Sequence, residues 1–292
     1  MFAVQIDRHG GPELLTVRDV APPTPKLGEV LVRTVASTLN PVDWKTRVWD
    51  VGPAFPMTLG WDIAGIVIAS RTPDFAIGDR VVAMSAQVAT GLGTWAELVA
   101  LPARLVSHAP VSVPLTEAAA LPLAGVTAFQ ALARLNLAQG ERLLVTGAVG
   151  AVGRTAVALA AHGGAVADGL VSREEHLQPA RSLGLQHASA SIADLKGESY
   201  DAIFDTAGVD VSHALASGGR YVSVADEPLP SIPGAQKSYV QENREHLAEL
   251  VRLVDADVLR PHIAHYFSVH QVRAAHELFE KGGLTGKVGL CF

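Results

Sequence analysis

Residues 146–155 read TGAVGAVGRT, which places three glycines at intervals of three residues. The apolar run RLLV precedes this stretch, and the helix-like run VGRTAVALAAHGG overlaps its end. Glycines in such a context are typical of dinucleotide binding, because they permit a tight turn, close approach of backbone N–H groups to a pyrophosphate, and close packing of the helix. The positive end of the helix dipole also attracts the pyrophosphate. The residues expected to contact the dinucleotide are Gly147, Gly150, Ala151, Val152 and Gly153.

The order of strand-like and helix-like segments after this stretch favours dinucleotide binding over a turn that only permits tight packing. The segments AVADGLV (165–171), YDAIFDTAG (200–208) and GGRYVSVA (218–225) read as strands, and REEHLQPARSLG (173–184) reads as a helix. Strands that alternate with helices predict a parallel sheet with right-handed crossovers. The sequence therefore predicts a doubly wound α/β unit.

The two ends of the chain have a different character. The first hundred residues form short runs rich in Val, Ile and Ala, separated by Gly and Pro, which predict a β-rich lobe. A helical pattern begins near Thr116, and Pro122 should interrupt it. A helix is expected over 246–259. Strands are expected again at IAHYFSV (263–269) and GKVGLCF (286–292), with a helix between them.

Composition excludes several classes of protein. The 292 residues are 49% hydrophobic and 18% charged, with a formal net charge of −6, which disfavours a nucleic-acid-binding protein. No apolar run approaches the roughly 20 residues of a membrane-spanning helix, and the N-terminus lacks the apolar core of a signal peptide. The single cysteine, Cys291, cannot form an internal disulfide. We expect a cytoplasmic protein that acts on neither a membrane nor a nucleic acid.

The residues after the second strand of the α/β unit bear on which dinucleotide is bound. A site for NAD commonly has Asp or Glu there, which holds the ribose hydroxyls. Ser172 and Arg173 take this place, and a guanidinium beside a hydroxyl suits the 2′-phosphate of NADPH. Asp168 is near but falls within the strand. We expect NADPH rather than NADH; the alternative is that Arg173 is a solvated residue of the next helix.

A second unusual segment, STLNPVDWKTR (37–47), lies in the β-rich lobe. Asn40 precedes a proline, which favours an extended backbone, and its amide could face a ligand or cap the helix that follows. Asp43 and Lys45 are close enough in sequence to form a surface ion pair, which is the default interpretation for such residues.

Several motifs, in fixed order and spread over nearly the whole chain, resemble a known family. They are TLNPVDWKTR, LGWDIAGIV, FAIGDRVVAM, GTWAELV, PLTEAAALPLAGVTAFQAL, LLVTGAVGAVG, ARSLG and GKVGL. Together they resemble the zinc-free quinone oxidoreductase branch (zeta-crystallin and its bacterial relatives) of the medium-chain dehydrogenase/reductase superfamily.

The resemblance implies an α/β fold with two domains. A GroES-like, β-rich catalytic domain would comprise residues 1–115 and 259–292, and a Rossmann domain would comprise residues 116–258. It also implies NADPH-dependent reduction of quinones or of α,β-unsaturated carbonyl compounds by a homodimer. Zinc-dependent members carry a Cys near the position of Asn40 and a His at that of Trp61, so no metal is expected here.

Site residues also follow from the resemblance. Asn40 should lie beside the nicotinamide and the substrate, Thr127 near the phosphates, and Ala207 and Gly208 under the nicotinamide half. Lys45 takes the place where many bacterial members carry Tyr. It resembles the lysine of alkenal and enone reductases, and we expect it to donate a hydrogen bond to the substrate carbonyl.

Three further expectations concern the site and its role. We expect Asp43 to hold Lys45 in place. The segment over 226–246 looks shortened relative to the family, which bears on dimerisation. Two other functions remain open: a tailoring enoyl reductase of a secondary-metabolite pathway, and a non-catalytic NADPH-binding sensor.

Overall fold

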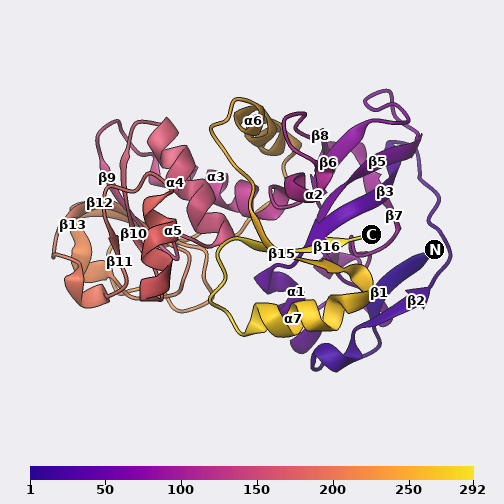
Figure 1. Ribbon diagram of the computed structural model, residues 1–292, viewed down its shortest axis with the longest axis horizontal. Helices are drawn as coiled ribbons and strands as arrows, with labels where there is room; N and C mark the ends of the chain where they lie inside the picture. The colour runs from indigo at the N-terminus through magenta and orange to yellow at the C-terminus, as the bar shows by residue number, and fades with distance from the viewer.

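The computed structural model describes residues 1–292 and divides into two lobes that lie side by side (Figure 1). The terminal lobe, which we define by its two sheets, is built from both ends of the chain. The central lobe is built around one six-stranded sheet. Both chain termini lie in the terminal lobe (Figure 1).

The terminal lobe contains a seven-stranded sheet of order β15-β16-β3-β5-β6-β8, in which β7 also pairs with β3, and a three-stranded sheet of order β2-β1-β4. All its strand pairs are antiparallel except β15–β16. Its strands are β1 Phe2–Ile6, β2 Thr16–Asp19, β3 Glu29–Thr38, β4 Met57–Thr58, β5 Asp62–Ser70, β6 Arg80–Met84, β7 Leu98–Pro102, β8 Val106–His108, β15 Ile263–Ser268 and β16 Lys287–Cys291. Its helices are α1 Pro41–Val48 and α7 Val272–Glu280.

The central lobe has a parallel sheet of order β11-β10-β9-β12-β13-β14, which is the doubly wound order 3-2-1-4-5-6. Its strands are β9 Arg142–Thr146, β10 Val166–Leu170, β11 Ala188–Ser189, β12 Tyr200–Asp205, β13 Leu215–Ser223 and β14 Gln236–Lys237. Its helices are α3 Pro122–Leu135, α4 Ala151–His162 and α5 Leu177–Arg181. The predicted parallel sheet is therefore confirmed.

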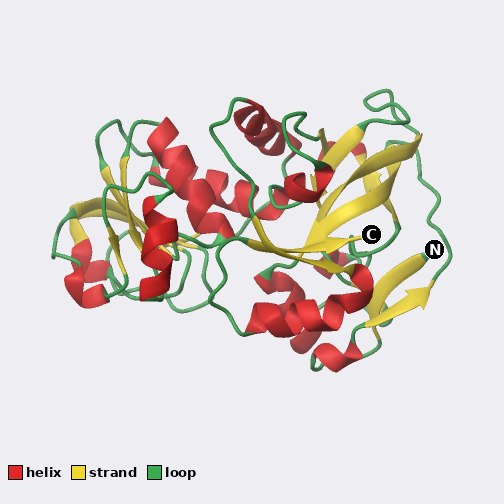
Figure 2. Ribbon diagram, in the orientation of Figure 1, coloured by secondary structure: helices red, strands yellow, loops and turns green.

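Successive residues of the central strands face opposite sides of the sheet, as in any β-strand. Leu143 and Phe204 face the side covered by α3 and α4, and pack with their alanines. Leu144 and Ile203 face the other side, where loop residues such as Val211 cover them. The crossovers β11–β12 and β12–β13 contain only the short 3-10 turns Ile192–Asp194 and Ser212–Ala214, so one face carries helices and the other carries loops (Figure 2).

A proline sets the start of one helix, and another helix is shorter than expected. The helical pattern expected from residue 116 divides into α2 (Leu115–Ala118) and α3, which begins at Pro122. A proline is tolerated there because the first helical N–H groups have no intrahelical acceptor. The helix expected over 173–184 is shorter than predicted: a 3-10 turn at Glu174–His176 precedes α5, which contains Pro179.

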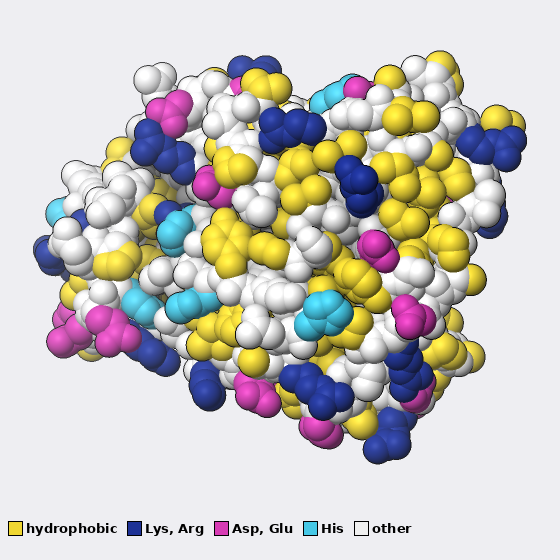
Figure 3. Space-filling model, turned by 45° about the vertical axis from the view of Figure 1, so that its right-hand side comes forward, with side chains coloured by type: hydrophobic (Ala, Val, Ile, Leu, Met, Phe, Trp, Pro, Cys, Tyr) yellow, Lys and Arg dark blue, Asp and Glu magenta, His cyan; other side chains and the backbone are white.

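A shared core joins the lobes. Helices α2 and α6 (Arg244–Asp255) pack with Ala36, Ala64 and Val82 of the terminal sheet. Val126 of α3 and Leu121, the residue before α3, belong to the same cluster. No helix has both the length and the apolarity that a bilayer crossing requires. On the face drawn in Figure 3, acidic, basic and hydrophobic side chains are interspersed.

Candidate active site

The glycine-rich turn lies at the carboxyl end of β9, where the strand order of the central sheet reverses between β9 and β12. Gly147 has φ +62°, and a Cβ there would lie 2.6 Å from the Thr206 hydroxyl oxygen. A Cβ on Gly153 would overlap the Gly147 carbonyl oxygen. Gly150 caps α4, so the turn leads directly into the N-terminus of a twelve-residue helix. Backbone conformation and close packing both require glycine here.

A buried carboxylate organises the neighbouring loop after β12. One Asp205 oxygen accepts hydrogen bonds from the Thr146 hydroxyl at 2.6 Å and from the backbone N–H groups of Ala207 and Gly208 at 3.2 and 3.0 Å. Ser223 donates to its other oxygen at 2.9 Å. The loop with Ala207 and Gly208 is thereby fixed beside the glycine-rich turn. The sequence prediction missed Asp205, whose signal was a charged residue that ends the apolar run YDAIFD.

The residues expected to select the cofactor follow β10. Ser172 and Arg173 line a groove of about 960 Å³, which also reaches His187 and Tyr200. Arg173 Nη1 lies 3.4 Å from Glu175, and both side chains are exposed.

Asp168 lies inside β10, as expected from its place in the sequence, and is buried. It accepts hydrogen bonds from Arg142 at 2.8 Å and from the Tyr200 hydroxyl at 3.0 Å. Burial and the Asp168 charge raise the pKa of Tyr200 to about 12, so its phenol stays protonated and can donate. Asp168 therefore belongs to an internal network of the sheet.

The register of the strands brings a set of buried polar side chains together in the terminal lobe. Gly289 pairs with Thr38 across β16 and β3, which brings Lys287 opposite Asn40. Lys287 donates to the Asn40 side-chain oxygen and, at 3.0 Å, to Asp62. Asp62 also accepts from the Thr38 hydroxyl and, at 2.9 Å, from the Asn40 amide nitrogen. We call these four residues, Thr38, Asn40, Asp62 and Lys287, the polar cluster; each is at most 4% exposed.

The polar cluster fixes the orientation of the Asn40 amide, because its oxygen faces the Lys287 ammonium and its nitrogen faces the Asp62 carboxylate. The sequence prediction named Asn40 but missed Asp62 and Lys287. Their signal was a single charged residue within each of the apolar segments LGWDIAG and GKVGL.

The expected pairing of Asp43 with Lys45 is wrong. Residues i and i+2 of a helix point in different directions, and both lie in α1. Asp43 is fully buried, and its Oδ2 accepts from the Asn40 backbone N–H at 2.8 Å, while its Oδ1 has no partner. Burial raises the pKa of Asp43 to about 8, so it is largely protonated at neutral pH.

Lys45 instead pairs with Asp226, in the loop after β13, and so links α1 of the terminal lobe to the central lobe. Its side chain is 18% exposed, and the ammonium lies 5.7 Å from the centre of the Trp49 ring. The Asp226 side chain is 52% exposed, so solvent competes for its side of the ion pair.

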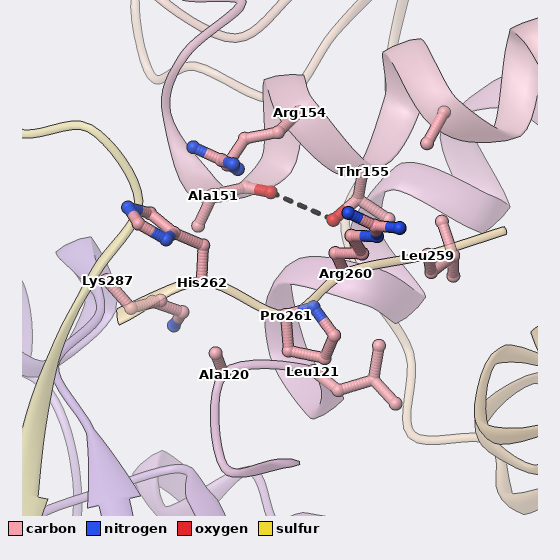
Figure 4. Close-up of a pocket in the computed structure, with 11 residues that line it drawn as sticks. Ala120, Leu121, Ala151, Arg154, Thr155, Leu259, Arg260, Pro261, His262 and Lys287 are labelled. Atoms are coloured by element: carbon pink, nitrogen blue, oxygen red, sulfur yellow. Dashed lines mark hydrogen bonds between the residues drawn. The ribbon is translucent and has the colours of Figure 1, made fainter. Parts of the chain in front are cut away.

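The nucleotide turn and the polar cluster adjoin. An isolated β-bridge pairs Gly150 with Gly286, the residue before Lys287. A small cavity of about 30 Å³ lies beside this bridge, lined by Ala151 and Arg154 of α4 and by Lys287 of β16 (Figure 4). Burial lowers the pKa of Arg154, and burial together with the Arg154 charge lowers the pKa of His262 on the opposite wall.

Helix α3 reaches the polar cluster from its own N-terminus. The Leu123 backbone N–H donates to Asp62 at 2.7 Å, and the hydroxyl of Thr127, one turn later, donates to the Leu123 carbonyl at 2.7 Å. Thr127 is 7% exposed. Its hydroxyl oxygen can accept one further hydrogen bond.

The residues at the zinc positions named above do not fit that metal. Asn40 already faces the Lys287 ammonium, which would repel a cation, and Trp61 has no lone pair to donate. No group of three or more His, Cys, Asp or Glu side chains is placed to hold a metal ion. The residues of the central lobe do fit a nicotinamide dinucleotide, since the glycine-rich turn leads directly into the N-terminus of α4 and Arg173 offers a cation.

Comparisons with known proteins agree with this arrangement. Residues 26–111 match the alcohol dehydrogenase GroES-like domain family, and residues 183–289 match the zinc-binding dehydrogenase family. The chain is 30% identical to the NADPH-dependent alkenal/one oxidoreductase of Arabidopsis thaliana, over 96% of this chain and 76% of that protein. It is 31% identical to a chloroplastic quinone oxidoreductase of Triphysaria versicolor, over 99% and 97% of the two chains. The quinone oxidoreductase of Coxiella burnetii superposes with a TM-score of 0.88 at 28% identity, covering 100% and 99% of the chains.

Proposed function

Because the chain belongs to the quinone oxidoreductase branch of the medium-chain dehydrogenase/reductase superfamily, we propose that it is an NADPH-dependent, zinc-independent reductase of quinones or α,β-unsaturated carbonyl compounds. It is an oxidoreductase of the quinone and enone reductase type that binds a nicotinamide cofactor and acts on small molecules. The single observation that carries the proposal is the bridge between Gly150 and Gly286, which joins the nucleotide turn to the polar cluster. The proposal includes the division into residues 1–115 with 259–292 and residues 116–258, and a homodimer.

The cofactor, when bound, supplies a hydride. The residues proposed to hold it are those of the glycine-rich turn at the α4 N-terminus, the loop fixed by Asp205, and Ser172 with Arg173. The preference for NADPH rests on Arg173, whose guanidinium has spare donors, and on Asp168, whose carboxylate is already engaged by Arg142 and Tyr200.

The terminal lobe would stabilise the oxygen on which negative charge develops during reduction. The Asn40 amide nitrogen donates one of its two hydrogens to Asp62, which leaves the other for a substrate oxygen. Lys45 would exchange Asp226 for that oxygen, and an ammonium is a strong donor to developing charge. The Asn40 amide is held by protein contacts before substrate arrives, so little reorganisation of this donor is required.

The test is oxidation of NADPH by the purified protein in the presence of a benzoquinone, a naphthoquinone, a 2-alkenal and an exocyclic enone, each repeated with NADH. Turnover of an acceptor with NADPH, and much slower turnover with NADH, is the expected result. NADPH binding without turnover of any acceptor would contradict a general quinone and enone reductase and favour a specialised pathway substrate or a sensor. Equal rates with NADH would contradict the cofactor preference alone.

A further inference from the structure

A loop of the terminal lobe touches the residue that is proposed to select NADPH. The loop over 281–286 connects α7 to β16 and extends toward the central lobe (Figure 1). A Cβ built on Gly283 would lie within 2.5 Å of three Arg173 atoms, Cζ, Nη1 and Nη2. Because the three atoms are at nearly equal distances, the guanidinium plane lies face-on against the Gly283 backbone. Only a residue without a side chain allows this approach.

The face-on contact leaves the edges of the guanidinium free. The one protein acceptor near Arg173 is Glu175, at 3.4 Å in an exposed pair that is worth little. Arg173 also lines the groove of about 960 Å³ with Ser172. A planar guanidinium makes its bidentate bonds to phosphate through its N–H edges, in its own plane. Gly283 thus supports the orientation in which those edges are presented.

The loop cannot easily retreat from Arg173. Its far end is held by the bridge between Gly286 and Gly150 and by the backbone hydrogen bond from Lys287 to His262, at 3.0 Å. Lys287 itself is buried in the polar cluster. A side chain at position 283 would therefore displace the guanidinium rather than the loop.

We propose that Gly283 is a specificity-determining positioning residue, which seats Arg173 so that it can bind the 2′-phosphate of NADPH. This inference rests on the proposed function, because it takes Arg173 as the phosphate ligand. Selection of the cofactor would then depend on both lobes: the central lobe supplies Arg173, which binds the phosphate, and the terminal lobe supplies Gly283, which positions Arg173.

The neighbouring Gly282 provides a matched control. Gly282 and Gly283 have φ of +66° and +71°, so alanine at either position meets a similar backbone cost, but a Cβ on Gly282 would meet no atom within 4 Å. Dissociation constants for NADPH and NADH, measured by calorimetry on wild type, Gly282→Ala and Gly283→Ala, compare the two. We expect Gly283→Ala to weaken NADPH binding about tenfold relative to Gly282→Ala, the scale of one charge-assisted hydrogen bond, with the same NADH affinity in both.

A double variant tests whether Gly283 acts through Arg173. In an Arg173→Ala background, Gly283→Ala should cause no further loss of NADPH affinity, because the guanidinium that the new Cβ would displace is absent. A wild type that prefers NADPH, with equal affinities in the two glycine variants, would overturn the role of Gly283 alone. A further loss in the double variant would also overturn it. A wild type that binds NADPH and NADH equally would overturn the proposed cofactor preference as well.

Discussion

Replacement of Lys287 by methionine should destabilise the protein strongly. Methionine retains most of the apolar stem but removes the ammonium that lies 3.0 Å from the Asp62 carboxylate, with both residues at most 4% exposed. Loss of one partner from a buried ion pair costs about 3–5 kcal/mol, because the other charge stays buried without compensation. Asp62 keeps three donors, from Thr38, Asn40 and the Leu123 backbone, so we expect the lower end, about 3 kcal/mol.

The assay is thermal unfolding without cofactor, followed by circular dichroism and tryptophan fluorescence. At roughly 2–4 °C per kcal/mol, the Lys287→Met variant should melt about 6–12 °C below wild type. Asp62→Asn provides the second half of a double-mutant cycle, since it removes the carboxylate and keeps the shape. The double variant should melt above Lys287→Met, because no unpaired charge remains.

Two results would refute this reasoning. One is a melting temperature of Lys287→Met within about 2 °C of wild type, which would mean that the ion pair contributes less than about 1 kcal/mol. The other is simple additivity of the two losses in the double variant, which would mean that Lys287 and Asp62 do not interact.

Three further predictions concern single side chains. Burial raises the pKa of Asp43 to about 8 from an ordinary 3.8, so the folded protein holds this proton more tightly than the unfolded chain. Wild type should therefore lose stability as pH rises from about 4 toward 8, by up to about 1.4 kcal/mol per pH unit. Thermal melts of Asp43→Asn should show a flatter dependence of stability on pH. Burial lowers the pKa of His276 to about 3 from 6.5, so wild type should lose stability as pH falls from about 6.5 toward 3, and His276→Leu should resist acid better. Lys45→Ala should lower kcat for enone or quinone reduction at least about tenfold, whereas Asp226→Ala, which removes only its partner, should not; each should change stability by less than about 1 kcal/mol.

Each of these three predictions has a result that would contradict it. Parallel pH profiles for wild type and Asp43→Asn would mean that Asp43 is ionised in the folded protein. Acid sensitivity retained in His276→Leu would assign it to other groups; the ring lies 3.6 Å from Glu280, but a neutral imidazole forms no ion pair there. Equal turnover in wild type and Lys45→Ala would remove Lys45 from the reaction.

Local patterns in the sequence predicted the central lobe well, because its elements are specified by short-range features. The strand before TGAVGAVG, the helix after it and the break at Pro122 all lie where expected. These features depend on glycine and proline backbone conformation and on hydrophobic periodicity, which act within about ten residues.

The polar cluster could not be predicted in the same way. Lys287 meets Asn40 only because β16 pairs with β3 in one register, and nothing near either residue specifies that pairing. The pairing of Asp43 with Lys45 failed for the opposite reason: proximity in sequence suggested a contact that helix geometry forbids. The roles assigned to Asn40, Lys45 and Arg173 remain predictions.

The position of β16 has a consequence for how the protein is made. This strand lies between β15 and β3, yet the whole central lobe is translated before it. During synthesis, the residues 36–38 of β3 that β16 will pair keep an open edge, and such an edge can recruit a strand from another nascent chain. Lys287 is therefore synthesised after the strands that it joins. Asp62 gains its counter-charge, and Asn40 its hydrogen-bond donor, only when residues 287–291 have emerged from the ribosome.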